Sequence, residues 1–357
     1  MNISARFNVT EILKKRGELL RRVMNMPSSG IGGQAVIEGI MMKNGDKYAV
    51  AVRKPDGKIE LDIKDCKSIT GGNKILELPF IRGIFKFVDS LVTGVKTLTY
   101  SAGFYEDEEP EEQTKADRAL SRMFGEKAES VIMGATVVIS VIIAVALFMM
   151  LPLFLADVMA KYIPFISTDA VPVIEGILKI AIFLAYVILI SMMEDIQRTF
   201  MYHGAEHKCI NCIETGNTLT VENVAKSSRF HKRCGTSFML IVMIISIIFF
   251  VFIRSDNTLI RYGLRLLLLP VIAGVSYEFI RLAGRTSNPV VSLLSKPGLW
   301  MQRFTTKEPD DQMIEVAIEA VEAVFDWKAY LKENGIELDE PDGLEMYYEE
   351  PEEAQFR

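Results

Sequence analysis

The chain has 357 residues, half of them hydrophobic, and a formal net charge of −6 at pH 7. This composition excludes a disordered, fibrous or disulfide-rich secreted protein and predicts contact with lipid. The negative excess lies in residues 281–357, where acidic side chains outnumber basic ones by 17 to 8, so no broad basic surface for nucleic acid is expected.

The N-terminal part of the chain predicts two different structures. Residues 1–29 show no apolar stretch followed by a cleavage site, so we expect a helical segment and no signal peptide. Residues 30–72 contain β-prone runs at 35–42, 48–53 and 58–63, separated by typical hairpin turns, and predict a small antiparallel β-rich cytoplasmic domain. The glycines of residues 30–39 could cradle a phosphate, but their spacing fits neither a P-loop nor a Rossmann fingerprint, which favours tight turns and close strand packing.

Residues 73–130 are predicted to connect this domain with the membrane. Residues 76–104 form a mostly apolar helix pattern broken by charges, which suits an amphipathic helix on the cytoplasmic interface or on the bundle better than a span. An acidic, proline-containing linker follows at 106–112. The charged interruptions are Arg82, Lys86, Asp89 and Lys96.

Four apolar runs within residues 131–280 predict a membrane domain. The uncharged run 131–155 is long enough to cross a hydrocarbon core of about 30 Å as a helix. The run 171–193 is interrupted only by Glu175 and Lys179, which lie one turn apart and could pair or snorkel. The run 238–253 is shorter, and 264–280 is bracketed by Arg265 and by Glu278, which we expect to pair with Arg281. We therefore predict an α-helical polytopic membrane protein with about four transmembrane helices.

The distribution of lysine and arginine predicts the orientation of these helices. Thirteen of these residues flank the predicted spans on one side and four on the other. By the positive-inside rule, both termini and the segment 194–237 face the cytoplasm of a multi-pass protein in the cell membrane.

The segment 194–237 contains the residues most suited to metal chemistry. All three histidines of the chain and three of its four cysteines fall within it. His203, Glu206 and His207 form an H-x-x-E-H string, and a spacing of four residues places both imidazoles on one face of a helix. Neutral imidazole and thiolate are the usual zinc ligands, so the string predicts two ligands and a general base.

Further ligands are needed to complete such a site. If His231 and Cys234 joined the two histidines, four protein ligands would close the coordination shell and the site would be structural. A set of three would leave a position open for catalysis. Cys212 and Glu214 are additional candidates, and the sequence does not choose among these sets. Alternatively, the histidines could contact lipid phosphate or cap helix ends.

The C-terminal part, residues 281–357, is predicted to form a cytoplasmic tail. Apolar residues in 312–327 follow a helical period and predict an amphipathic helix. The last 20 residues are acidic and favour a solvated end that could dock a protein partner.

Four blocks of this sequence resemble the signature blocks of the bacterial YqhQ family. They are GGQAVIEGIMM at 32–42, YHGAEHK at 202–208, RCGTSF at 233–238 and TTKEPDD at 305–311. The resemblance implies a multi-pass membrane protein of a family of unknown function that is described as a predicted metal-dependent enzyme. It also implies a suspected metal site on His203, Glu206 and His207.

Two hypotheses of function follow. The first is a metal-dependent membrane hydrolase that uses a divalent ion, expected to be zinc, with Glu206 as base and with Gln34 and Glu38 as substrate contacts. The second is a non-catalytic membrane scaffold or biogenesis factor with a structural metal site. A transporter is favoured less, because four spans with few internal charges offer little to line a polar path across the membrane. A homo-oligomer could provide such a path.

Overall fold

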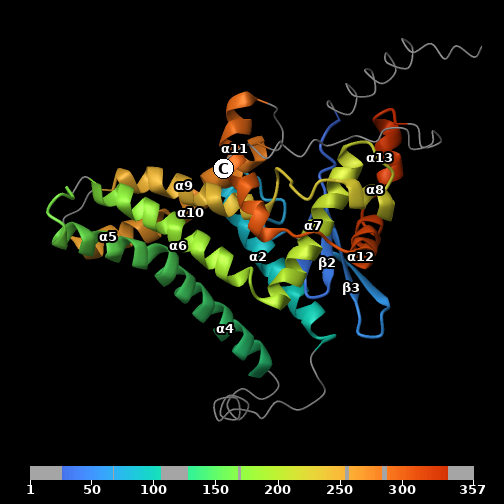
Figure 1. Cartoon of the computed structure of the whole chain (residues 1–357), viewed down its shortest axis with the longest axis horizontal. Helices are drawn as coiled ribbons and strands as arrows, with labels where there is room; N and C mark the ends of the chain where they lie inside the picture. Colours follow the sequence, from blue (N-terminus) through green and yellow to red (C-terminus); the bar gives the residue numbers. More distant parts are fainter. Residues whose placement is uncertain are drawn as a thin grey trace, which may run out of the picture.

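The chain combines a bundle of apolar helices with a smaller unit in which helices cover a β-sheet (Figure 1). The computed structural model describes residues 26–66, 68–105, 128–167, 170–253, 257–283 and 288–336. Most of the predicted helical segment 1–29, the acidic linker 106–112 and the acidic C-terminal end lie outside these residues.

The sheet has four antiparallel strands in the order β1-β2-β3-β4. They are β1 (Gly32–Val36), β2 (Gly39–Asn44), β3 (Lys47–Arg53) and β4 (Ile59–Asp65). The antiparallel sheet is as predicted, but the run 35–42 is a hairpin and not one strand. It turns at Glu38, which adopts a left-handed φ of 48°, and its carbonyl accepts a hydrogen bond of 2.9 Å from the Arg53 amide. The strand after the turn then pairs closely with β3.

Helices from distant parts of the chain complete the core of this unit. The segment 194–237 contains α7 (Glu194–Glu214) and α8 (Val221–Lys226), and the tail contributes α12 (Asp311–Glu322) and α13 (Trp327–Glu333). Ile40 and Met42 of β2 pack in one buried cluster with Tyr202 and Ile210 of α7 and with Ile314 of α12. The sheet is therefore covered on this face by α7 and α12.

The predicted amphipathic helix 312–327 is divided in two. Helix α12 ends at Glu322, and α13 begins five residues later at Trp327. The Asp326 side chain accepts a hydrogen bond of 2.9 Å from the Ala329 amide and so caps a new helix. Because the cap starts a second helix, the apolar stripe continues onto a separate element.

The bundle contains three helices that are long and apolar enough to cross a membrane, within the described parts of the chain. The first runs without a break through α4 (Ala128–Val145), the π-helical turn η2 (Ala146–Met150) and α5 (Leu151–Tyr162). The second is α6 (Val171–Ile190), and the third is α10 (Thr258–Ala283). The predicted third run, 238–253, forms α9 (Gly235–Val251), which at 17 residues is shorter than a usual span. The predicted fourth run, 264–280, lies within α10, which is longer than the run itself. Arg265 does not end the helix, because its side chain is buried in an ion pair with Glu175.

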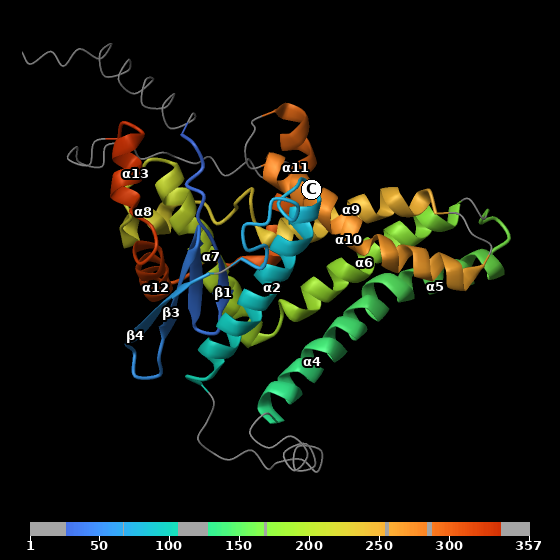
Figure 2. The same cartoon turned by 180° about the vertical axis from the view of Figure 1, so that it is seen from behind.

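Helix α2 (Ile81–Ala102) joins the bundle to the sheet (Figure 2). Near its start, Arg82 donates to both oxygens of Glu278 on α10, at 2.7 and 2.6 Å. The predicted partner Arg281 also forms an ion pair with this carboxylate, at the longer distance of 3.9 Å. Further along α2, the Gly94 carbonyl accepts a hydrogen bond of 3.1 Å from Gln34 of β1. Several large apolar side chains of α2 are exposed, among them Phe87, Val88, Leu91, Val92 and Leu98.

Candidate metal centre

The H-x-x-E-H string lies on α7, between the sheet and the bundle. His203 and His207 are four residues apart, and their ring centroids are 4.4 Å apart. Glu206 lies between them in sequence on the same helix. The helical spacing thus brings the two imidazoles together, as the sequence pattern predicts.

Cys234 brings a third ligand atom to these rings. It caps the N-terminus of α9, and its Sγ lies 3.2 Å from Nε2 of His203. One ligand atom from each of His203, His207 and Cys234 lies within 4.8 Å of the others. His207, Cys234 and Glu206 each expose 5% or less of their surface, whereas His203 is half-buried, so the group is largely shielded from solvent and His203 is its more accessible side.

Two main-chain carbonyls fix the orientation of the imidazoles. Nδ1 of His203 lies 2.8 Å from the carbonyl oxygen of Thr305, which ends α11 (Pro289–Thr305), and Nδ1 of His207 lies 2.6 Å from that of Arg229. A carbonyl accepts only, so each Nδ1 carries the hydrogen and donates it. When a ring in this tautomer is neutral, its Nε2 lone pair is available to a ligand, which is the arrangement that supports metal-bound histidines.

The charges of the group favour a thiolate at Cys234. Burial raises the pKa of the Cys234 thiol, but the positive charge of His203 and the hydrogen bonds from His203 and His207 outweigh it and hold the pKa well below its ordinary value. Burial lowers the pKa of His203, whereas the Cys234 thiolate raises it, to about 9. Thiolate is the form of cysteine that binds metals, so this donor set fits zinc or a similar ion.

The carboxylate of Glu206 is held from the sheet side. Its Oε1 accepts a hydrogen bond of 2.9 Å from the main-chain amide of Gly33 in β1. A Cβ at Gly33 would lie 3.3 Å from Cδ of Glu206 and still closer to the Met41 carbonyl oxygen. The glycine therefore lets β1 lie close to β2, which agrees with the close strand packing predicted for the block 30–39, and it also lets β1 approach Glu206.

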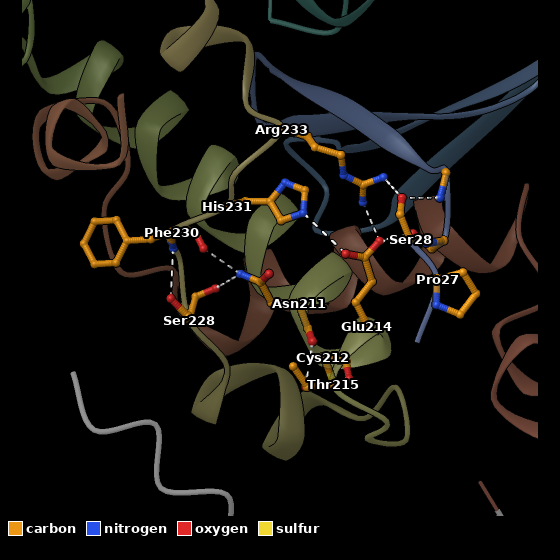
Figure 3. Close-up of polar contacts among 12 residues, drawn as sticks. Pro27, Ser28, Asn211, Cys212, Glu214, Thr215, Ser228, Phe230, His231 and Arg233 are labelled. Carbon is orange, nitrogen blue, oxygen red and sulfur yellow. Dashed lines mark hydrogen bonds and ion pairs between the residues drawn. The ribbon is translucent and has the colours of Figure 1, made fainter. Parts of the chain in front are cut away.

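His231 and Glu214 form a neighbouring polar cluster (Figure 3). The His231 ring contacts that of His207, with 5.6 Å between the centroids, but His231 is not among the three residues whose ligand atoms converge. Nε2 of His231 lies 3.6 Å from Oε2 of Glu214, whose Oε1 accepts hydrogen bonds from the Ser29 amide at 2.8 Å and from Arg233. Gln302 of α11 fixes the main chain of His231 by accepting from its amide and donating to its carbonyl, each at 2.8 Å. The structure thus brings His203, His207 and Cys234 together but directs the His231 ring to Glu214.

Acid should destabilise this second cluster. Burial lowers the pKa of His231. Burial raises the pKa of Glu214, but the contact with His231 and the charge of Arg233 outweigh it and bring the pKa to about 2. Because of both shifts, the unfolded chain binds more protons in acid than the folded chain does. The stability of the folded protein therefore decreases as the pH is lowered, first below about 6.5, where His231 titrates, and then from about 4.5 toward 2, where Glu214 titrates. Thermal unfolding of the Glu214→Gln protein between about pH 4.5 and 2 should show a smaller loss on acidification than wild type, because the variant lacks the carboxylate that titrates in this range, and an equal loss would contradict this assignment.

The other predicted site residues have partners elsewhere. Gln34 bonds to α2, as described above, and Glu38 pairs with Arg198 and accepts a hydrogen bond of 3.3 Å from the Tyr202 hydroxyl. Cys212 is buried in the core, where its Sγ donates to the Thr218 carbonyl at 3.4 Å. These three side chains thus contact other parts of the chain and lie outside the group of three ligand atoms.

The fold and the site together define a mostly helical protein with a small sheet, three candidate membrane spans and a histidine–cysteine group. The family described as "Protein of unknown function (DUF1385)" matches residues 78–327, and the chain belongs to this family. It is similar to the "Uncharacterized protein YqhQ" of Bacillus subtilis (strain 168), with 35% identity over 310 residues that cover 85% of this chain and 94% of the relative. The resemblance to the YqhQ family is thus confirmed. No solved structure matches the chain.

Proposed function

We propose that this protein is a metal-dependent hydrolase of the cell membrane with its active site at the cytoplasmic face. The observation that carries the proposal is the convergence of one donor atom each from His203, His207 and Cys234 within 4.8 Å, with Glu206 on the same helix as the two histidines. Three protein ligands leave one coordination position open, which distinguishes catalytic from structural zinc sites. A bound zinc ion would supply Lewis-acid polarisation of a carbonyl group and a lowered pKa for water.

The residues of the chain would divide the remaining work. Glu206 would take the proton of the attacking water on its carboxylate, since the Gly33 amide already orients that group at 2.9 Å. The carbonyls of Thr305 and Arg229 would keep both imidazoles in the ligand tautomer. Burial of the group would limit access of bulk water and strengthen these interactions.

The arrangement of the bundle supports four membrane crossings with both termini in the cytoplasm. Helix α9 packs against α6 and α10. The end of α5, the start of α6, the end of α9 and the start of α10 lie at the same end of the bundle, away from the sheet (Figures 1 and 2). The 17 residues of α9 extend about 25 Å, so α9 would cross most of a hydrocarbon core. The metal group at its N-terminal cap would then lie at the membrane surface, where amphipathic substrates are in reach.

A structural metal site in a membrane scaffold is the second candidate. It is favoured by burial, because His207 and Cys234 are almost inaccessible and tie α7 to the start of α9. In that case a fourth protein ligand would complete the shell, and removal of the ion would unfold the connection between sheet and bundle.

Metal content with coordination number tests both candidates. We expect purified full-length protein to contain one zinc per chain by elemental analysis. X-ray absorption should show two nitrogen ligands, one sulfur ligand and one additional light atom that exogenous anions displace. A shell of four protein ligands that anions do not change would favour the scaffold, and absence of stoichiometric metal would overturn both. Cys234→Ser should replace the sulfur signal, whereas Cys66→Ser should leave it unchanged.

A further inference from the structure

A second group of charged side chains lies inside the bundle, at the end away from the sheet. Asp157 of α5, Glu175 and Lys179 of α6, and Arg261 and Arg265 of α10 contribute to it. Asp157 and Arg261 form an ion pair near the helix ends, and Arg265 follows one helical turn deeper. The sequence predicted spans with few internal charges, and it predicted that Glu175 and Lys179 pair with each other or snorkel to the membrane surface.

The deeper ion pair joins Glu175 to Arg265 and is completely enclosed. The two side chains expose 2% or less of their surface. The pair is not fully hydrogen-bonded: Nη1 of Arg265 and Oε2 of Glu175 meet in the ion pair, but among the described residues Oε1 of Glu175 and Nε of Arg265 have no hydrogen-bond partner. Buried polar atoms in apolar surroundings normally have such partners, so this pair has unused capacity to bind a polar group.

Lys179 adds a positive charge that no carboxylate balances. It is 4% exposed, and its Nζ donates a hydrogen bond of 3.2 Å to the Ser246 hydroxyl on α9. The Phe250 ring lies between the two deep cations, with Lys179 at 4.4 Å and Arg265 at 4.8 Å from its centroid. Among the described residues, no acidic side chain forms an ion pair with Lys179. The cluster thus holds three cations and two carboxylates.

One excess charge inside an apolar bundle is costly unless an anion accompanies it. A guanidinium fork and an ammonium group, with hydrogens to donate, recognise phosphate oxygens. We propose that Lys179, Arg265 and Ser246 form a binding site for one phosphate group, entered past the Asp157–Arg261 pair at the end of the bundle. The phosphate belongs either to an anionic phospholipid or to a free phosphate ion. This inference does not depend on the metal site or on hydrolase activity.

Titration of the purified full-length protein in a neutral detergent tests the site with two probes, phosphatidylglycerol and inorganic phosphate. We expect saturable thermal stabilisation by at least one probe. Lys179→Met should weaken the apparent Kd by about tenfold or more, because a charge-assisted contact is lost. Lys161→Met is the matched control, since Lys161 is an exposed lysine on α5 near the same end, and it should bind as wild type does.

The outcomes separate the sources of the phosphate group. A response to phosphatidylglycerol alone identifies a lipid headgroup, and a response to inorganic phosphate identifies a free ion. Equal Kd values for wild type and Lys179→Met would overturn the proposal. If Lys179→Met does not fold, the titrations of the wild-type protein and of Lys179→Arg decide. The absence of a saturable response of wild type to either probe would overturn the site, and a response that the Lys179→Arg protein retains would support it.

Discussion

Replacement of Glu206 by glutamine is expected to lower hydrolytic activity by about 10²–10⁴-fold, the usual contribution of a general base. Glutamine has the same shape, and its carbonyl oxygen can still accept the hydrogen bond that Gly33 donates at 2.9 Å. The amide cannot take a proton at neutral pH, so only the chemical step should suffer. Initial rates on fluorogenic peptide and ester substrates, measured on protein in liposomes, provide the test.

The same samples show whether the loss is chemical or structural. Zinc content and thermal unfolding of the Glu206→Gln protein should equal those of wild type. Glu222→Gln is the matched control, because Glu222 is exposed on α8 and pairs with Lys226 four residues later. Full activity in the Glu206→Gln protein would refute the general-base assignment and would favour the scaffold.

The parts of the site that follow from local spacing could be predicted from the sequence. An interval of four residues places His203 and His207 on one face of any helix, so the pairing of their rings required no knowledge of the fold. The sheet was predictable for a similar reason, since both predicted hairpin turns contain a glycine with positive φ, Gly45 and Gly57. In each case the relevant interaction spans only a few residues.

The long-range parts of the site could not be predicted in this way. Cys234 and His231 are only three residues apart, yet only Cys234 reaches His203, because Gln302 holds the main chain of His231 and Glu214 attracts its ring. The Thr305 carbonyl that orients His203 is about 100 residues distant in sequence. Such contacts depend on how α7, α9 and α11 pack, and no spacing rule contains that information.

The membrane helices show the same division. Apolar length predicted α4–α5 and α6, but charges misled the assessment of the last helix. Arg265 was read as a boundary, since an isolated arginine is costly in lipid. In the folded bundle it pairs with Glu175, so α10 extends over 26 residues from Thr258 to Ala283. Pairing between helices is invisible to a scan along one helix.

Replacement of Gly204 by alanine is expected to destabilise the protein severely and to weaken metal binding. Gly204 lies between the metal-ligand candidate His203 and Glu206, where the segment after α11 crosses α7. A Cβ at this position would lie under 3.0 Å from the Lys307 carbonyl oxygen, a main-chain atom that cannot rotate away. Lys307 is also tied to α7, because its amide donates a hydrogen bond of 2.9 Å to the Phe200 carbonyl.

The clash should therefore move residues 305–309 away from α7 as a unit. Displacement of the Thr305 carbonyl would release Nδ1 of His203, and loss of such an orienting contact typically costs 10–100-fold in metal affinity. We expect a stability loss on the order of 3 kcal/mol, the upper range for overpacking. Thermal unfolding with and without a chelator, together with competitive zinc titration, measures both effects.

Gly235→Ala is the matched control for this substitution. Gly235 follows the other ligand candidate, Cys234, but a Cβ there would meet no atom within 4 Å. Alanine also favours the helix that begins at this residue, so the variant should be as stable as wild type or slightly more so. If Gly204→Ala behaved like Gly235→Ala in both measurements, the close contact between α7 and residues 305–309 would not support the histidine pair. The second carbonyl, at Arg229, would then be the contact on which the orientation of the site depends.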